Sequence, residues 1–281
     1  MDPNSRAILM SGGGAAGPEY IGTYKFTTPR TYNSYQWQVP AQTAYIQAVA
    51  WGSGGKGEQA SHPFYCNYYG YCGTDGGGGG FSTAVIPVTA GETLYLGVGT
   101  LDNPSINNGY NGGRGRGGGF TSVFRGSTPL IIAGGGGGVT SSTNSVDHAG
   151  GGGGDPLIQY NHPYGGNYGS YLMGAQPDGG GGYFGGDSNT STSLGGTGYV
   201  TATGNLHTQT ISANYYIQPQ TNHPDYVSGY GGGGRNHLAN GWVDLGWGSG
   251  LLVIHCLGGG YDPASNPSTV IPSTRTILGT Y

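Results

Sequence analysis

The residues of this chain that could do acid–base or metal chemistry are few and dispersed. Seven histidines and thirteen acidic residues occur among 281 positions, and only three of the acids are glutamates. No histidines have the i, i+4 or close-loop spacing of a known metal site, and a hydrolytic pair of carboxylates is hard to assemble. The G-x-S-x-G pattern of a nucleophile elbow is absent. We therefore expect no catalytic residues, no metal, no cofactor and no enzymatic activity.

Two glycine-rich stretches match nucleotide-binding patterns only in their letters. Residues 52–57 (GSGGKG) fit G-x-G-x-x-G, but residues 58–63 (EQASHP) offer no helix whose N-terminus could meet a pyrophosphate. Residues 112–120 (GGRGRGGGF) resemble an RNA-binding segment, although Arg114 and Arg116 could equally hydrogen-bond glycine carbonyls. Nucleic-acid binding needs a basic surface, whereas this chain has two lysines and a net charge of −4. We therefore expect no nucleic-acid partner.

Aromatic loops are the strongest candidates for recognition. Residues 64–72 (FYCNYYGYC) place five aromatic rings in nine positions, and such rings give rigid, amphipathic contact area at low entropic cost. A second cluster lies within 161–171, and a third comprises Tyr215, Tyr216, Tyr226 and Tyr230. The alternative is that these rings cover a glycine core that has no side chains of its own. The predicted partner-binding residues are Phe64, Tyr65, Tyr68, Tyr69, Tyr71, Tyr164, Tyr168 and Tyr171.

The three cysteines do not settle the redox setting. Cys66 and Cys72 flank five residues of the first aromatic loop, and both a disulfide between them and two free thiols stay open. Cys256 lies in the apolar run 251–257. It is predicted to be a buried free thiol that packs as a small hydrophobe.

The elements that must position these loops are predicted from an unusual composition. Glycine accounts for 64 residues, and charged residues for only 8% against a usual share of about 25%. No segment has a helical period, no Gly-X-Y repeat indicates collagen, and β-type runs bounded by Gly, Pro and Thr predict strands. We expect hairpins from 81–88 with 93–99 and from 120–125 with 129–133, and a last pair from 241–245 with 251–256. Two further strands are expected at 22–27 and 43–51.

Glycine tracts lie directly against these strands. Runs of three or more occupy 12–14, 76–80, 117–119, 134–138, 150–154, 179–182, 231–234 and 258–260. Tracts without side chains can pack side by side as polyglycine-II helices, in which hydrogen bonds between tracts replace those missing within each tract. The alternative is that they are flexible linkers. Because strands bracket most tracts, we favour the packed lattice.

The order of these motifs resembles a known family. The motifs are GTYKFTTP at 22–29, AYIQAVAWG at 44–52, GGGF at 78–81, VTAGETL at 88–94, GVG at 97–99, FRG at 124–126 and LIIA at 130–133 before the tract 134–138. Over about 20–257 the chain is similar to the glycine-rich domain of phage tail-fibre and other virion proteins, bacterial surface proteins and the ectodomains of one family of animal receptor tyrosine kinases. This resemblance implies a jelly-roll-like β-sandwich with packed polyglycine-II helices, and a role in assembly or ligand binding.

Together these features predict an all-β protein with little or no α-helix. We expect an N-terminal arm (1–19), a glycine-rich β domain (20–257) and an extended C-terminal tail (258–281). No apolar stretch approaches the 18 residues of a membrane span, and residues 1–6 lack the pattern of a signal peptide. The expected function is that of a minor capsid, decoration or fibre protein on a virion surface or outside the cell, in contact with other virion or fibre chains as a homo- or hetero-oligomer. A receptor- or glycan-binding adhesin and a self-assembling extracellular filament subunit are the alternatives.

Overall fold

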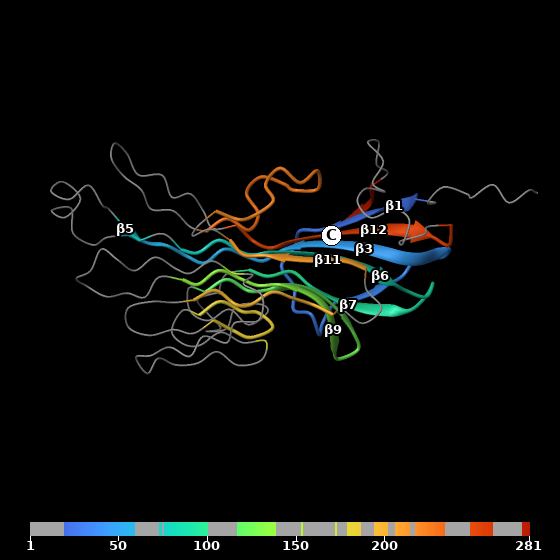
Figure 1. Cartoon of the computed structure of the whole chain (residues 1–281), viewed down its shortest axis with the longest axis horizontal. Helices are drawn as coiled ribbons and strands as arrows, with labels where there is room; N and C mark the ends of the chain where they lie inside the picture. Colours follow the sequence, from blue (N-terminus) through green and yellow to red (C-terminus); the bar gives the residue numbers. More distant parts are fainter. Residues whose placement is uncertain are drawn as a thin grey trace, which may run out of the picture.

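The described part of the chain is an all-β structure with two main sheets and no helix (Figure 1). The computed structural model describes residues 20–59, 73–74, 76–100, 117–138, 153, 172, 179–186, 194–201, 206–213, 217–233, 248–260 and 277–281. The predicted fold class, an all-β sandwich, is therefore confirmed. The strands are β1 (Tyr20–Phe26), β2 (Gln36–Gln38), β3 (Thr43–Trp51), β4 (Glu58–Gln59), β5 (Gly73–Thr74), β6 (Phe81–Pro87), β7 (Thr93–Gly97), β8 (Thr121–Arg125), β9 (Thr128–Ala133), β10 (Tyr199–Val200), β11 (Leu206–Ile211), β12 (Leu251–Gly258) and β13 (Ile277–Thr280).

The larger sheet has six strands in the order β11-β6-β3-β12-β1-β13. Its centre is β3 and β12, which pair antiparallel from Leu251 opposite Trp51 to Gly258 opposite Thr43. Every residue of β12 is buried, which explains its continuous apolar sequence LLVIHCLG. The smaller sheet has five strands in the order β10-β9-β8-β7-β2, and β4 and β5 form a separate two-stranded ladder.

The two main sheets enclose a side-chain core. Alternate residues of β3, β6 and β12 face it, among them Ile46, Ile86 and Ile254, and β7 and β9 contribute Leu94 and Ile131 from the other sheet. The period of two in a strand sends the intervening residues to the outer faces. These outer faces also carry buried clusters: Trp51, Phe81 and Val253 on one sheet, and Phe120, Phe124 and Ile132 on the other.

One predicted hairpin is confirmed and one is wrong. Strands β8 and β9 pair antiparallel, as predicted for 120–125 and 129–133. Strand β6 does not pair with β7; it pairs with β3 and β11, while β7 pairs with β2 and β8. Residues 88–92 thus carry the chain from one sheet to the other, and both strands contribute apolar side chains to the same core. A turn signal marks a change of direction, but it does not distinguish a hairpin from a crossing between layers.

The turn at this crossing is tied to the tip of the β8–β9 hairpin. Arg125 donates two hydrogen bonds to the Glu92 carboxylate, from Nε at 3.2 Å and from Nη2 at 3.0 Å, and a third from Nη2 to the Pro87 carbonyl at 2.8 Å. Gly91 there has a φ of 81°, a conformation that favours glycine.

The last predicted pair falls partly outside the described residues. Residues 241–245 lie outside the described residues, and β12 is paired on one edge with β3 and on the other with β1. No edge of 252–257 is therefore left for a hairpin partner.

Glycine tracts continue from the strands and pack together at one end of the sandwich. We call residues 52–55, 76–80, 117–119, 134–137, 153, 179–182, 194–197, 231–233 and 248–250 the glycine bundle. Most of its residues are buried. Its amides donate to carbonyls of other tracts: Gly55 to Gly77 at 2.7 Å, Gly77 to Gly137 at 2.9 Å, and Gly135 to Gly181 at 2.8 Å. The described tracts are therefore hydrogen-bonded to one another and are not flexible linkers.

The end of the predicted C-terminal tail belongs to the larger sheet. Strand β13 pairs parallel with β1, with Thr23 opposite Ile277 and Lys25 opposite Thr280. Residues 277–281 thus form an edge of the sandwich.

Candidate functional site

The predicted contact residues lie outside the described residues. This holds for all eight partner-binding candidates (Phe64, Tyr65, Tyr68, Tyr69, Tyr71, Tyr164, Tyr168 and Tyr171) and for Cys66 and Cys72. The structure does describe residues on either side of the segments that carry them. Residues 60–72 lie between β4 and β5, which pair with Glu58 opposite Thr74, and residues 161–171 lie between two bundle residues, Gly153 and Gly180. Both aromatic segments are therefore bounded in sequence by residues in or next to the glycine bundle.

The third aromatic cluster is partly described, and its rings cover the sandwich. Tyr226 and Tyr230 pack on the outer face of the larger sheet, against Trp51, Phe81 and Val253. The Tyr226 hydroxyl donates to the Tyr230 carbonyl at 3.0 Å and also contacts Gln218. For these two tyrosines the covering role, and not a free contact surface, is the one observed. Burial raises the pKa of Tyr226 above its ordinary value.

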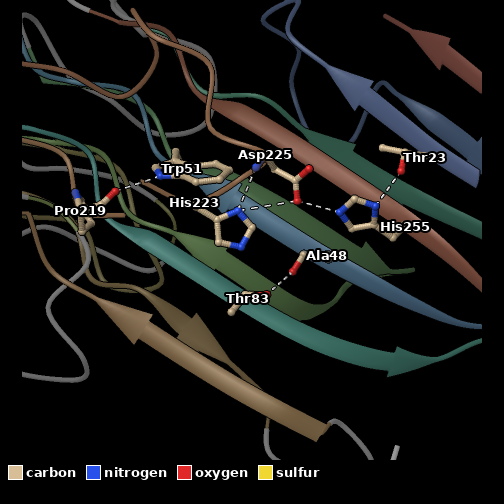
Figure 2. A network of polar contacts seen from close by, with 8 residues as sticks. All are labelled: Thr23, Ala48, Trp51, Thr83, Pro219, His223, Asp225 and His255. Atoms are coloured by element: carbon tan, nitrogen blue, oxygen red, sulfur yellow. Dashed lines mark hydrogen bonds and ion pairs between the residues drawn. The ribbon is translucent and has the colours of Figure 1, made fainter. Parts of the chain in front are cut away.

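A buried chain of polar side chains crosses the same outer face (Figure 2). Thr23 Oγ1 lies 2.7 Å from His255 Nδ1, and His255 Nε2 lies 2.7 Å from Asp225 Oδ2. The Tyr20 hydroxyl lies 2.5 Å from Thr23 Oγ1. Because a carboxylate can only accept, His255 donates through Nε2. The Thr23 hydroxyl bonds to Nδ1 on the other side of the ring, and also to the Tyr20 hydroxyl.

This hydroxyl–imidazole–carboxylate order is that of a nucleophilic triad, but its surroundings do not permit catalysis. Thr23, His255 and Asp225 are all completely buried, and Tyr20 occupies the far side of the Thr23 hydroxyl. A nucleophile must be reachable by its substrate, and no substrate atom can approach this oxygen. The chain instead gives three buried polar groups their hydrogen-bond partners.

The polar chain holds residues 217–233 against the sheet. Asp225 belongs to this segment, whereas Thr23 and His255 belong to β1 and β12. Trp51 Nε1 donates to the Pro219 carbonyl at 3.0 Å, and the His223 ring contacts the Trp51 ring edge-on at a centroid distance of 5.5 Å. The Asp225 amide donates to His223 Nδ1 at 3.2 Å. We call residues 217–230 the cover segment; it shields the outer cluster and leads directly into the glycine bundle at Gly231.

Sequence reasoning missed this polar chain, because its members are 30 and 232 residues apart. One local signal was available. His255 interrupts an apolar run that the pattern predicts to be buried, and a buried imidazole needs partners for both ring nitrogens.

The remaining described residues add no reactive centre. Cys256 is a buried free thiol, as predicted, and burial raises its pKa to about 12, so it is not a thiolate at neutral pH. Among the residues that the structure describes, no three His, Cys, Asp or Glu side chains are grouped to hold a metal ion. Within the same residues no helix has the length and apolar character of a membrane span.

The edge of β1 forms a further, unpredicted contact site, which is occupied by the segment 277–281. Leu278 lies over Gly22, where a Cβ atom would overlap its side chain. Tyr281 stacks on Phe26 with a centroid distance of 5.4 Å. Little in the amino-acid pattern indicates this strand, because ILGT is short and follows a stretch rich in Pro, Ser and Thr.

Comparison of the chain with known proteins finds no matching family model and no curated protein of significant similarity. The class of protein that the structure defines is therefore an all-β sandwich with a glycine bundle at one end, and the resemblance to glycine-rich virion domains stays a prediction.

Proposed function

We propose that this chain is a structural component of a virus particle, a minor capsid, decoration or fibre protein that acts through protein–protein contacts. The observation that carries the proposal is the glycine bundle. It is a buried backbone lattice. The segment 60–72 lies between β4 and β5, next to bundle residues 52–55 and 76–80 in the sequence, and the segment 161–171 lies between the bundle residues Gly153 and Gly180. A rigid support with aromatic segments suits recognition, because pre-organised loops lose less entropy on binding.

The polar chemistry of the described residues agrees with this proposal. Their triad-like group, Thr23, His255 and Asp225, is closed to substrate and ties the cover segment to the sheet. We assign this buried group to the stability and shape of the fold, and not to catalysis.

We further propose that the sandwich is jelly-roll-like and that the tracts adopt the polyglycine-II conformation. Amides three positions apart donate to the same neighbouring tract, Gly77 to Gly137 and Gly80 to Gly134, whereas Gly79 donates to Gly231 of another tract. This arrangement is expected of a polyglycine-II helix with three residues per turn. A crystal structure with φ near about −75° and ψ near about +145° along residues 76–80 would support it; another backbone conformation there would contradict it.

The functional test is the presence of the chain in particles. Antibodies raised against the purified chain should detect it in the particle peak of a density gradient, at a fixed ratio to the major capsid or tail protein. The double variant Tyr68→Ala/Tyr69→Ala should lose its place in the particle, whereas Asn33→Ala, a change at an exposed position of the sandwich, should keep it.

Two outcomes would contradict the proposal. Absence of the chain from washed particles would remove the virion role. Saturable binding to an immobilised glycan, lost in the Tyr68→Ala/Tyr69→Ala variant, would instead favour the adhesin.

A further inference from the structure

The edge of β1 that does not pair with β12 is bound along its length by the segment 277–281. Thr23, Tyr24 and Lys25 are opposite Ile277, Gly279 and Thr280 in a parallel ladder. The Tyr281 amide donates to the Lys25 carbonyl at 2.9 Å, and its carbonyl accepts from the amides of Thr27 and Thr28 at 2.7 and 3.0 Å. Addition of a strand to a sheet edge by such main-chain bonds is a recurrent mode of peptide recognition.

Side chains make this edge specific for the segment that it holds. Gly22 leaves a notch that Leu278 fills, and a Cβ at Gly22 would overlap Leu278. Tyr24 and Phe26 form an aromatic shelf on which Tyr281 stacks, with centroid distances of 6.3 and 5.4 Å. Pockets for alternate side chains give specificity in strand addition, so the edge selects this sequence.

The connection to this segment is much longer than the fold requires. On β1 the partner of Leu257 is Tyr20 and the partner of Ile277 is Thr23. Leu257 and Ile277 are therefore separated by three residues along β1 and by two strand spacings across it. Together these put their Cα atoms about 14 Å apart. The 18 residues from 259 to 276 can span up to about 60 Å. A strand on so long a connection reaches the β1 edge of a neighbouring molecule as well as its own.

The segment also remains apolar on its outer side. Among the described residues, the large hydrophobic side chains that are exposed are Ile217, Ile277, Leu278 and Tyr281, and the last three have exposed fractions of 52%, 43% and 42%. Residues 277–281 (ILGTY) contain neither charge nor proline, the usual devices that keep an edge strand from pairing with another chain. An edge of this kind favours contact with a second molecule.

From these observations we propose that the β1 edge is a docking site for the segment 277–281 of a second copy of this chain, so that copies are joined by exchanged strands. The incoming segment has the same sequence as the one observed, so the notch and the shelf fit it without change. The proposal names the partner and the surface for the assembly role proposed above, and rests on that role only for its biological purpose.

Disulfide trapping between differently tagged molecules tests the exchange. One molecule carries Lys25→Cys and the other Thr280→Cys, the register partners across the two strands, both in a Cys66→Ser/Cys72→Ser background with the buried Cys256 retained. After unfolding and joint refolding, we expect a mixed-tag disulfide dimer whose fraction rises with concentration. The matched pair Asn33→Cys with Thr280→Cys should give much less of this dimer, because Asn33 is an exposed turn residue that is not paired in register with Thr280.

The opposite result is equally measurable. If the chain that carries both Lys25→Cys and Thr280→Cys forms an internal disulfide while the mixed pair stays monomeric at every concentration, the strand docks only within its own molecule and the proposal fails. Particle association is measured separately, so the failure of exchange and the failure of the virion role are distinguishable.

A second pair of variants tests the notch itself. Gly22→Val should lower the yield of mixed dimer about tenfold, since Leu278 must leave its site at a cost of about 1.4 kcal/mol, and a further Leu278→Ala in the segment should recover part of it. Ile217→Ala, an exposed apolar residue outside the segment, should leave the yield unchanged. Equal yields with Gly22→Val and without it would overturn the proposed register.

Discussion

The sandwich and the glycine bundle are both buried, but side chains hold the sandwich together and backbone groups hold the bundle together. In the sandwich, apolar side chains such as Ile46, Leu94 and Ile131 fill the space between sheets about 10 Å apart. In the bundle, glycine backbones touch one another directly: a Cβ at Gly79 would overlap the carbonyl of Gly52, and one at Gly55 that of Gly137. The sandwich depends on side-chain volume, whereas the bundle depends on its absence.

This difference implies that the bundle depends on the sandwich. Ordering one residue's backbone costs about 1–2 kcal/mol, and a hydrogen bond returns about 0.5–1.5 kcal/mol net, so glycine tracts gain little when they order alone. Five tracts run directly into or out of the strands β3, β6, β8, β9 and β12. The register of the strands therefore fixes the register of the tracts, and Ser82 Oγ, which donates to the Ile132 carbonyl at 2.9 Å, joins the two sheets beside the bundle.

The largest effect expected from this comparison is that of one methyl group added to the bundle. Gly79→Ala places its Cβ on the backbone of Gly52, which is itself hydrogen-bonded to Gly80 at 2.9 Å. Rigid backbone cannot move aside as a side chain can. We expect a loss of about 3 kcal/mol or more in the free energy of unfolding, measured by urea denaturation.

Gly259→Ala is the matched control for that change. Gly259 lies in a turn with no atom within 4 Å of an added Cβ, and we expect a change within about 0.5 kcal/mol. Equal effects at the two positions would mean that the bundle is not close-packed.

The two regions also differ in how far the sequence predicted them. Strand β3 occupies the predicted residues 43–51, and β6 and β9 begin within one residue of prediction, because β-branched runs bounded by Gly and Pro carry strong local signals. Strands β2 and β13 were missed: QWQ is too short for an alternating pattern, and ILGT has no long β-branched run. Their strand conformation depends on partners distant in sequence.

The sequence could not predict which residues far apart along the chain come into contact. The motif residues Glu92 and Arg125 meet across 33 positions, and Thr23 meets His255 across 232. The crossing at 88–92 was mistaken for a hairpin for the same reason. The position of the tracts along the chain predicted that they pack, but only the structure shows which amide bonds to which carbonyl.

The next largest effect is expected where the cover segment is tied to the sandwich. Asp225→Ala leaves His255 Nε2–H buried without its acceptor, and an unsatisfied buried donor costs about 2 kcal/mol. Urea denaturation should show this loss, and Trp51, which bonds to Pro219 in the same segment, should report it by fluorescence. Asp225→Asn keeps an acceptor oxygen and should lose less than half as much. Equal losses in both variants would mean that the carboxylate charge, and not the hydrogen bond, holds the segment.

A smaller effect comes from pH, acting within the sandwich core. Burial raises the pKa of Cys256 to about 12, from an ordinary value of 9.0. Between these values the folded chain retains a thiol proton that the unfolded chain has lost, so stability is complete below pH 9 and falls as pH rises toward 12. The slope is at most about 1.4 kcal/mol per pH unit. Cys256→Ala should remove this part of the slope and leave the part due to tyrosines such as Tyr24, whose pKa burial also raises. Identical slopes in the two proteins would contradict the assignment.

The smallest effect is expected from one carbon removed from the sandwich core. Ile254→Val deletes a methylene from a completely buried position of β12 and should cost about 1 kcal/mol, because neighbouring side chains relax into part of the space. Measured by the same urea denaturation, it is the counterpart of Gly79→Ala: each changes the chain by one carbon, one in a side-chain core and one between backbones. A side-chain core absorbs the loss by small rotations, whereas the Cβ added at Gly79 meets only the backbone of Gly52. If the two variants lost equal stability, side chains and backbone would be equally able to adjust, and the distinction between the two regions would fail.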